Sequence, residues 1–147
     1  MLSSRNSLSN TDIIRILTDM GIHINGVYNR DDLPTLQEGF YVTNLDSKNG
    51  EGTHWTGFYY HRLHSIYFDP YGFPAPVEIE KKIKPYIFND IDIQDIDSTA
   101  CGYYVIGFIK YLYEKQDKGR YFEAFINRFS NDTKKNDNIL YDILYRK

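Results

Sequence analysis

Apolar residues recur at helical spacing in several segments of the 147-residue chain. The pattern near the N-terminus predicts a helix that Asn10 or Thr11 caps and that Gly21 ends. The clearest helical pattern is "STACGYYVIGFIKYLYEK" (98–115), and a shorter helix is predicted from about 77 to 83. Between the first and the second of these predicted helices lie segments whose apolar residues follow the pattern of strands.

Aromatic and β-branched residues follow the pattern of strands in the middle of the chain. The segment "FYVTNL" (40–45) reads as a strand, and "HWTGFYYH" (54–61) and "SIYFDPYG" (65–72) form a second and a third. A short turn near Arg62 and Leu63 separates the last two, which predicts a β-hairpin.

The remaining segments carry loop signals or mixed patterns. Residues 27–39 and 46–53 are predicted loops, and 92–97 is a short strand or a loop. The C-terminal residues 121–147 predict an amphipathic helix, a polar loop and a short terminal helix. No repeat or long linker interrupts this series, so we expect a single domain over 1–147.

Composition and charge narrow the class of protein. Hydrophobic residues make up 41% of the chain and aromatic residues 16%, which is typical of a globular domain with an aromatic core. The net charge of −3 argues against nucleic-acid binding as the main function, although the charge is uneven. Residues 89–97 are acidic, whereas Lys81, Lys82 and Lys84 form a basic group.

The lone cysteine and the apolar segments bear on the compartment. One cysteine cannot form an internal disulfide, and a free thiol is typical of a reducing, intracellular setting. The first twelve residues lack the apolar core of a secretion signal. The longest apolar stretch, which ends before Lys110, is too short to span a bilayer. We therefore expect an intracellular protein that is neither secreted nor held in a membrane.

Cys101 is the first candidate for chemistry. It follows "DST" where the predicted helix starts, and a helix N-terminus favours the thiolate form of a cysteine. A lone cysteine is more often a buried, inert residue. Gly102 follows directly and allows close backbone approach to the thiol, which favours the reactive interpretation.

His54 and Asp69 are the candidate base and its orienting carboxylate. If the hairpin turns at 62–63, residue 56 faces residue 69, and the two side chains are diagonal neighbours on one face. A turn one residue longer would place them on opposite faces, so the pairing depends on register. Taken alone, Asp69 is better explained as a turn residue in "DPYG".

Gln94 completes the set of candidate residues. It precedes Cys101 by seven positions, and its side-chain amide could donate to a developing oxyanion together with the backbone N–H of Cys101. His61 and His64 are expected on the surface beside the hairpin turn. No set of Cys and His at zinc-ligand spacing and no glycine-rich phosphate loop is present, so we expect no metal or other cofactor.

The ordered motifs resemble a known family. The segments "GTHWTGFYY" (52–60), "IYFDPYGFP" (66–74) and "IQDIDSTACGYYVIGFIKYL" (93–112) resemble the adenovirus-type cysteine proteases, the adenain family. They are most similar to the small versions carried by virophages, Polinton-like elements and large DNA viruses. The ubiquitin-like-specific proteases share the catalytic layout. The resemblance extends from about 26 to 114, and its specificity lies in the order of His-Trp, Asp, Gln and Cys-Gly.

The resemblance implies a fold, an activity and residue roles. The fold is α+β, with a small mixed sheet that holds His54 and Asp69 packed on the helix that starts at Cys101. His54 is the implied base, Asp69 the orienting residue, Gln94 the oxyanion-hole donor and Cys101 the nucleophile. Adenain has Glu at the third position and holds its activating peptide through a second cysteine. This chain has Asp69 and no second cysteine, so that covalent mode is unavailable, and we expect that any activating peptide would bind non-covalently.

The resemblance also implies partners, while leaving other functions open. We expect an endopeptidase that matures viral capsid or other structural precursors beside small residues such as glycine, inside the virion and the host cell. The acidic segment 89–97 weakens any expectation of DNA as a cofactor. An isopeptidase for ubiquitin-like modifiers would use the same residues. A non-enzymatic capsid or scaffold protein is the third possibility, against which the complete set of four residues argues.

Overall fold

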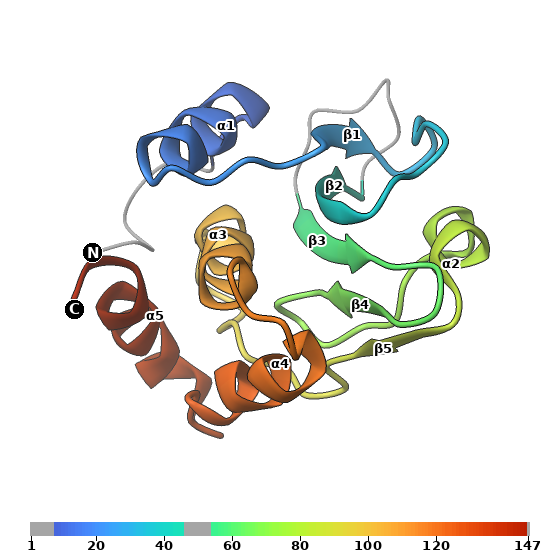
Figure 1. Ribbon diagram of the computed structural model, residues 1–147. Coiled ribbons are helices and arrows are strands. Elements are labelled where there is room, and N and C mark those ends of the chain that lie inside the picture. Colours follow the sequence, from blue (N-terminus) through green and yellow to red (C-terminus); the bar gives the residue numbers. More distant parts are fainter. Residues whose placement is uncertain (1–7, 46–53, 147) are drawn as a thin grey trace.

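The computed structural model describes residues 8–45 and 54–146, and they form an α+β fold around one mixed sheet. The sheet has five strands in the order β1-β2-β3-β4-β5 (Figure 1). The strands are β1 (Gly26–Asn29), β2 (Gly39–Asn44), β3 (Trp55–Tyr60), β4 (Ser65–Phe68) and β5 (Tyr86–Phe88). The central pairs β2–β3 and β3–β4 are antiparallel, whereas the edge strands β1 and β5 run parallel to their neighbours.

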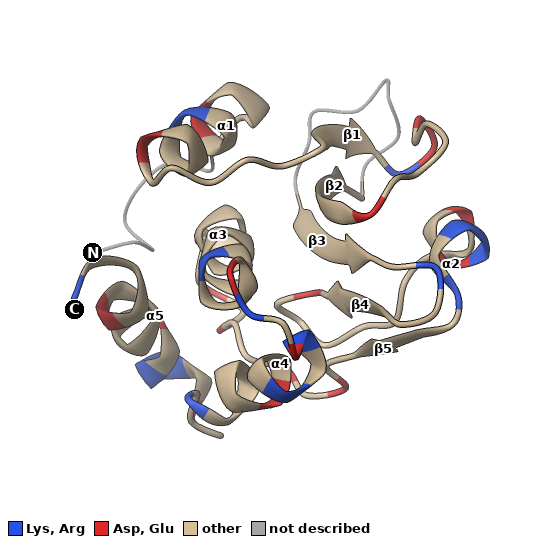
Figure 2. Ribbon diagram, in the orientation of Figure 1, with Lys and Arg blue, Asp and Glu red and all other residues tan. Residues whose placement is uncertain are grey.

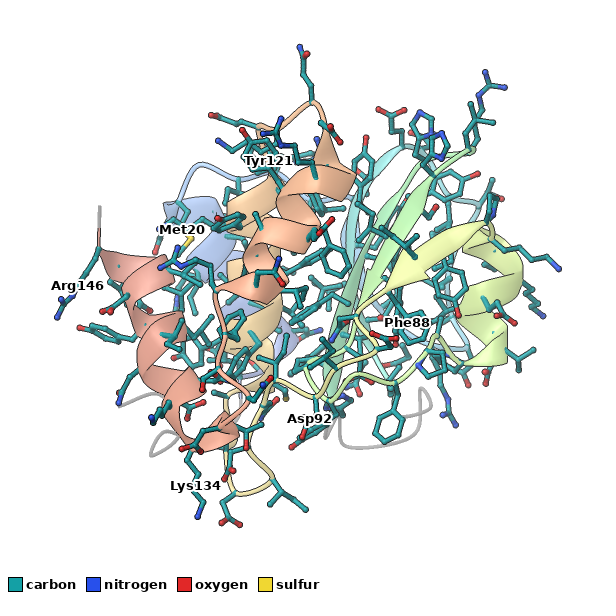
Figure 3. The ribbon with its side chains drawn as sticks, turned by 90° about the horizontal axis from the view of Figure 1, so that it is seen from below. Met20, Phe88, Asp92, Tyr121, Lys134 and Arg146 are labelled. Carbon is teal, nitrogen blue, oxygen red and sulfur yellow. The ribbon has the colours of Figure 1, made fainter. Side chains whose placement is uncertain are left out.

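Helices cover both faces of the sheet. They are α1 (Asn10–Asp19), α2 (Val77–Ile83), α3 (Cys101–Leu112), α4 (Lys118–Asn127), the short 3₁₀ helix η2 (Thr133–Lys135) and α5 (Asn136–Tyr145). Figures 1 and 3 show α2 on one side of the sheet and α1, α3, α4 and α5 on the other. The larger apolar core lies between the sheet and these four helices, and a smaller core lies under α2.

Helix α3 is the central element of the larger core. Ten of its twelve residues are buried, so water reaches little of its surface. It packs against β3 at Gly57, where an added Cβ would come within 2.7 Å of Val105 Cγ1. The missing side chain at Gly57 therefore lets α3 approach the sheet closely, which brings the start of α3 to the start of β3.

The hairpin has the register that its sequence predicts. Gly57 pairs with Phe68, Phe58 with Tyr67 and Tyr59 with Ile66, as a turn at 62–63 requires. The alternating side chains of both strands are buried on the two faces of the sheet, so a slip by one residue would exchange the faces.

The predicted helices are confirmed, with one correction at the first cap. Helix α2 spans 77–83, and α3 begins at Cys101. The N-cap of α1 is Ser9 rather than Asn10 or Thr11. Its hydroxyl accepts from the Asp12 N–H, and the Asp12 carboxylate accepts from the Ser9 N–H. This reciprocal capping box satisfies two backbone donors, which explains why the helix starts one residue earlier.

Two strands were missed by the sequence pattern. Strand β1 lies in a segment predicted as a loop, and β5 follows the proline-rich stretch around α2. Both are short edge strands: β1 is half-buried throughout, and β5 has only three residues, of which Ile87 is exposed. Neither is long enough, with a clear enough alternation, to be recognised as a strand from its sequence. Residues 92–97 form a loop, and the predicted loop at 46–53 lies outside the described residues.

Charges of both signs are interspersed over the helices (Figure 2). Lys81 and Lys82 share α2 with Glu78 and Glu80, which offset their charge locally, and Lys84 is the C-cap of the helix. Over residues 8–45 and 54–146, no helix combines the length and the apolar character that a bilayer span requires.

Candidate active site

His54 and Asp69 meet at one end of the central hairpin. His54 directly precedes β3 and Asp69 directly follows β4, so the confirmed register brings them together. The Nε2 atom of His54 lies 2.8 Å from Asp69 Oδ1. The Asp69 side chain is 1% exposed, whereas that of His54 is 19% exposed. The carboxylate is therefore shielded, while the imidazole still reaches the surface.

The Asp69 carboxylate is held in place by its neighbours. Its Oδ1 atom also accepts from the Tyr71 N–H at 2.8 Å, and its Oδ2 atom is buried without a hydrogen-bond partner among the described residues. Asn89 clamps the backbone at this position, since its Oδ1 accepts from the Asp69 N–H at 3.2 Å and its Nδ2 donates to the Asp69 carbonyl at 2.6 Å. The carboxylate thus faces His54 in a fixed orientation.

Cys101 is the first residue of α3 and is 5% exposed. Ala100 occupies the N-cap and has no side chain that could cap the helix. The positive end of the helix dipole is therefore directed at the region around the thiol, where it stabilises negative charge. This placement agrees with the predicted helix start.

The surroundings of His54 favour its charged form. Burial lowers the pKa of His54, but hydrogen bonds with Asp69 and Cys101, together with their charges, raise it to about 9. Because Nε2 faces Asp69, Nδ1 is the ring nitrogen left for the thiol. The three side chains therefore form the chain Cys101–His54–Asp69, in which His54 carries a proton at neutral pH.

Two aromatic residues flank the three side chains of Cys101, His54 and Asp69. Tyr71 stacks on the His54 ring, with ring centroids 4.9 Å apart and an interplanar angle of 23°. Trp55 is buried, its Nε1 donates to the Leu8 carbonyl at 2.9 Å, and its ring packs against the first turn of α3 at Gly102. Sequence reasoning did not assign Tyr71 or Asn89 to the site. The predicted hairpin register places residue 71 opposite residue 54 and could have indicated Tyr71, whereas only the tertiary fold brings Asn89 beside Asp69.

Gln94 lies in the loop that leads to α3. It is fully buried, its N–H donates to the Pro70 carbonyl at 3.0 Å, and its Nε2 donates to the Ser98 carbonyl at 2.9 Å. Its Oε1 atom is buried without a partner among the described residues. One N–H of the amide is thus engaged by Ser98, and the second remains for another acceptor. Gln94 is therefore linked to Pro70, the residue that follows Asp69, and to Ser98, three residues before Cys101.

The arrangement is suited to nucleophilic catalysis at a carbonyl. It combines a thiol at a helix N-terminus, an imidazole whose pKa that thiol helps to raise, and a buried carboxylate that orients the imidazole. Over residues 8–45 and 54–146, no three His, Cys, Asp or Glu residues are grouped so that they could hold a metal ion. His61 and His64 stack on each other at the far end of the hairpin, away from this site.

Comparisons with known proteins bear on the fold. No protein-family model matches the sequence, and no curated protein matches it. Among solved structures, the ASFV pS273R protease superposes with a TM-score of 0.59 at 14% sequence identity, over 95% of this chain. This chain spans 66% of the length of that protein. The fold is therefore shared with that protease, and the match does not single out the adenovirus-type enzymes.

Proposed function

We propose that this protein is a cysteine endopeptidase. The observation that carries the proposal is the chain Cys101–His54–Asp69, with the thiol at the start of a buried helix and the His54 pKa raised to about 9. The fold shared with the ASFV pS273R protease supports the same class of activity. A structural protein has no need of a partly exposed imidazole held between a thiol and a buried carboxylate.

The geometry suggests how acylation proceeds. The Cys101 thiolate attacks the carbonyl carbon of the peptide bond while His54 holds the proton. The oxyanion accepts hydrogen bonds from the Cys101 N–H and from the free N–H of Gln94. His54 then gives its proton to the leaving amine, and the peptide carbonyl remains bound to Cys101 as a thioester.

Deacylation reverses the role of His54. Neutral His54 takes a proton from a water molecule that attacks the thioester, and the thiol leaves as thiolate. Asp69 orients the ring and stabilises its charged form in both halves of the reaction, without itself taking up the proton. Tyr71 limits the tilt of the ring by stacking on it.

We further propose that the substrates are viral structural precursors cut beside small residues, within the virion or the infected cell. The sequence resemblance suggests this, and the burial of Cys101, with Trp55 packed on the neighbouring Gly102, favours a narrow cleft. A non-covalent activator remains compatible with a chain that has one cysteine. Mapping new termini after incubation with co-encoded capsid proteins tests the substrate class.

Peptide hydrolysis by the purified chain tests the activity. Cys101→Ala and His54→Ala should each abolish turnover, and a peptide vinyl sulfone should label Cys101 in the wild type. His64→Ala is the matched control, because His64 is exposed at the opposite end of the hairpin, and it should retain full activity. Turnover that survives Cys101→Ala would refute the proposal. Release of a folded ubiquitin-like modifier without cleavage of capsid proteins would instead identify an isopeptidase.

A further inference from the structure

The loop that carries Gln94 is tied to the C-terminal helix by side chains. Residues 89–100 connect β5 to α3 and contain no regular helix or strand. Figure 3 shows Asp92 of this loop and Lys134 of η2 at the same end of the molecule. Two neighbouring residues at the start of α5, Asn136 and Asp137, make the connections.

Asp137 accepts hydrogen bonds from two buried hydroxyls. Ser98 Oγ lies 3.1 Å from both carboxylate oxygens, and Tyr104 Oη lies 2.8 Å from Oδ1. Burial raises the pKa of Tyr104 above its ordinary value, and the charge of Asp137 raises it further. Tyr104 therefore stays a neutral donor to Asp137 throughout the working pH range.

Ser98 passes this restraint to Gln94. Its hydroxyl also accepts from the Ala100 N–H at 3.1 Å, and its carbonyl accepts from Gln94 Nε2 at 2.9 Å. An amide group is planar, so fixing one N–H of Gln94 fixes the direction of the other. The chain of contacts runs from Asp137 through Ser98 to the amide that would face the oxyanion.

Asn136 holds the other side of the same loop. It is fully buried, and its Nδ2 donates to the Ile93 carbonyl at 2.8 Å, next to Gln94 in the chain. Its Oδ1 accepts from the Ser130 N–H at 2.8 Å, and its Nδ2 also donates to the Ser130 carbonyl at 2.9 Å. These two bonds anchor the Asn136 side chain. Thr133 of η2 adds a third connection, because its hydroxyl donates to Asp95 Oδ1 at 2.9 Å.

From these contacts we propose that Asp137 is a positioning residue for the oxyanion donor. It acts through Ser98 on Gln94, while Asn136 holds the loop from the opposite side. The proposal rests on the cysteine peptidase function above. It gives the C-terminal helix a role in transition-state stabilisation, although no residue of that helix contacts the reacting atoms.

A double-mutant cycle between positions 137 and 94 tests the coupling. Asp137→Leu keeps the side-chain size and removes both acceptors, so kcat for a peptide substrate should fall about tenfold with little change in KM. In a Gln94→Ala background the same substitution should have no further effect on kcat. Asp137→Asn retains one acceptor oxygen and should recover most of the rate.

Matched variants separate positioning from general destabilisation. Asp142 lies on the same helix and forms an exposed ion pair with Arg146, so Asp142→Ala should leave kcat unchanged. Ser98→Ala removes the hydroxyl that bonds Asp137 and the Ala100 N–H, keeps the carbonyl that accepts from Gln94, and should reproduce the fall in kcat. Tyr104→Phe should change kcat little. If Asp137→Leu does not fold, the kcat values of Ser98→Ala and Tyr104→Phe test whether Asp137 positions Gln94 through Ser98. An unchanged kcat in Asp137→Leu or Ser98→Ala, or an equal loss in the Gln94→Ala background, would overturn the proposal.

Hydrogen exchange separates this inference from the proposed function. If the wild type hydrolyses peptides no faster than Cys101→Ala, the peptidase assignment fails, yet the structural coupling remains measurable. The Gln94 and Ala100 amides should then exchange faster in Asp137→Leu than in Asp142→Ala. Equal exchange in the two variants would show that Asp137 does not hold the loop.

Discussion

At the scale of single residues, the site depends on how its side chains are oriented. His54 is held by Asp69 at one nitrogen and stacks on Tyr71 across its face, so its remaining nitrogen is directed to Cys101. Gln94 is fully buried and tied to Ser98, which sets the direction of its free N–H. Two predictions test these orientations.

The raised pKa of His54 predicts the alkaline limit of activity. Because His54 must give a proton to the leaving amine, kcat/KM for a peptide should fall as the pH rises through about 9. Asp69→Asn removes the largest of the interactions that raise this pKa, so the fall should move to lower pH. A p-nitrophenyl ester, whose leaving group needs no proton, serves as the control and should not show the fall. A peptide profile that stays flat to pH 10 would contradict the assignment of His54 as the acid.

The role of Gln94 predicts a loss in kcat rather than in binding. Gln94→Ala removes a donor that matters chiefly once the oxyanion forms, so kcat should fall about 10²–10³-fold while KM changes little. Steady-state kinetics on a peptide ester and a peptide amide measure both constants. A kcat near that of the wild type would make Gln94 a structural loop residue only.

At the scale of elements, the fit of α3 against β3 decides the distance between nucleophile and base. Cys101 comes from the helix and His54 from the residue before the strand, so neither element alone contains the site. The contact between Gly57 and Val105 sets how closely the two elements approach.

An added methyl group at position 57 should push α3 away from the sheet. Gly57→Ala would place its Cβ 2.7 Å from Val105 Cγ1, so we expect a loss of about 1–3 kcal/mol in the free energy of unfolding and a fall in kcat. Val105→Ala in the same chain should restore part of the activity by making room. Gly119→Ala in α4 meets no atom within 4 Å and should leave both quantities nearly unchanged. Urea denaturation and peptide hydrolysis provide the two measurements, and wild-type values for Gly57→Ala would refute the close contact.

At the scale of the whole molecule, the interactions of His54 with Asp69 and Cys101 also contribute to the stability of the fold. The pKa of His54 is raised in the folded state, from 6.5 to about 9, so the folded protein binds more protons than the unfolded chain between these pH values. The contribution is present in full below pH 6.5 and is lost as the pH rises through about 9. A rise in pKa of this size corresponds to at most about 3 kcal/mol of stability. The true contribution is smaller, because His54 is partly exposed and solvent screens its interactions.

Denaturation across this pH range measures the contribution. The free energy of unfolding of the wild type, relative to that of His54→Gln, should decrease between pH 6.5 and 9. A difference that is constant over this interval, or that increases, would contradict the raised pKa.

The sequence by itself determined the elements that have a strong period and the residues capable of chemistry. The pattern of α3 placed Cys101 at a helix start. The pairing of His54 with Asp69 depended on a hairpin turn at 62–63, and the register of the structure confirms that turn. The chemistry of a lone thiol, an imidazole, a carboxylate and an amide then indicated nucleophilic catalysis. Local spacing was sufficient for these features, since each depends on neighbours within one element or one turn.

Only the tertiary structure decided the edges of the sheet and the support of the site. The strands β1 and β5 exist because β2 and β4 supply their hydrogen-bond partners, which a short, half-buried segment cannot signal locally. Asn89 and Asp137 reach the site from separate segments of the chain. Their contacts with Asp69 and Ser98 are polar and have no periodicity, so only the packing of the whole chain brings them together.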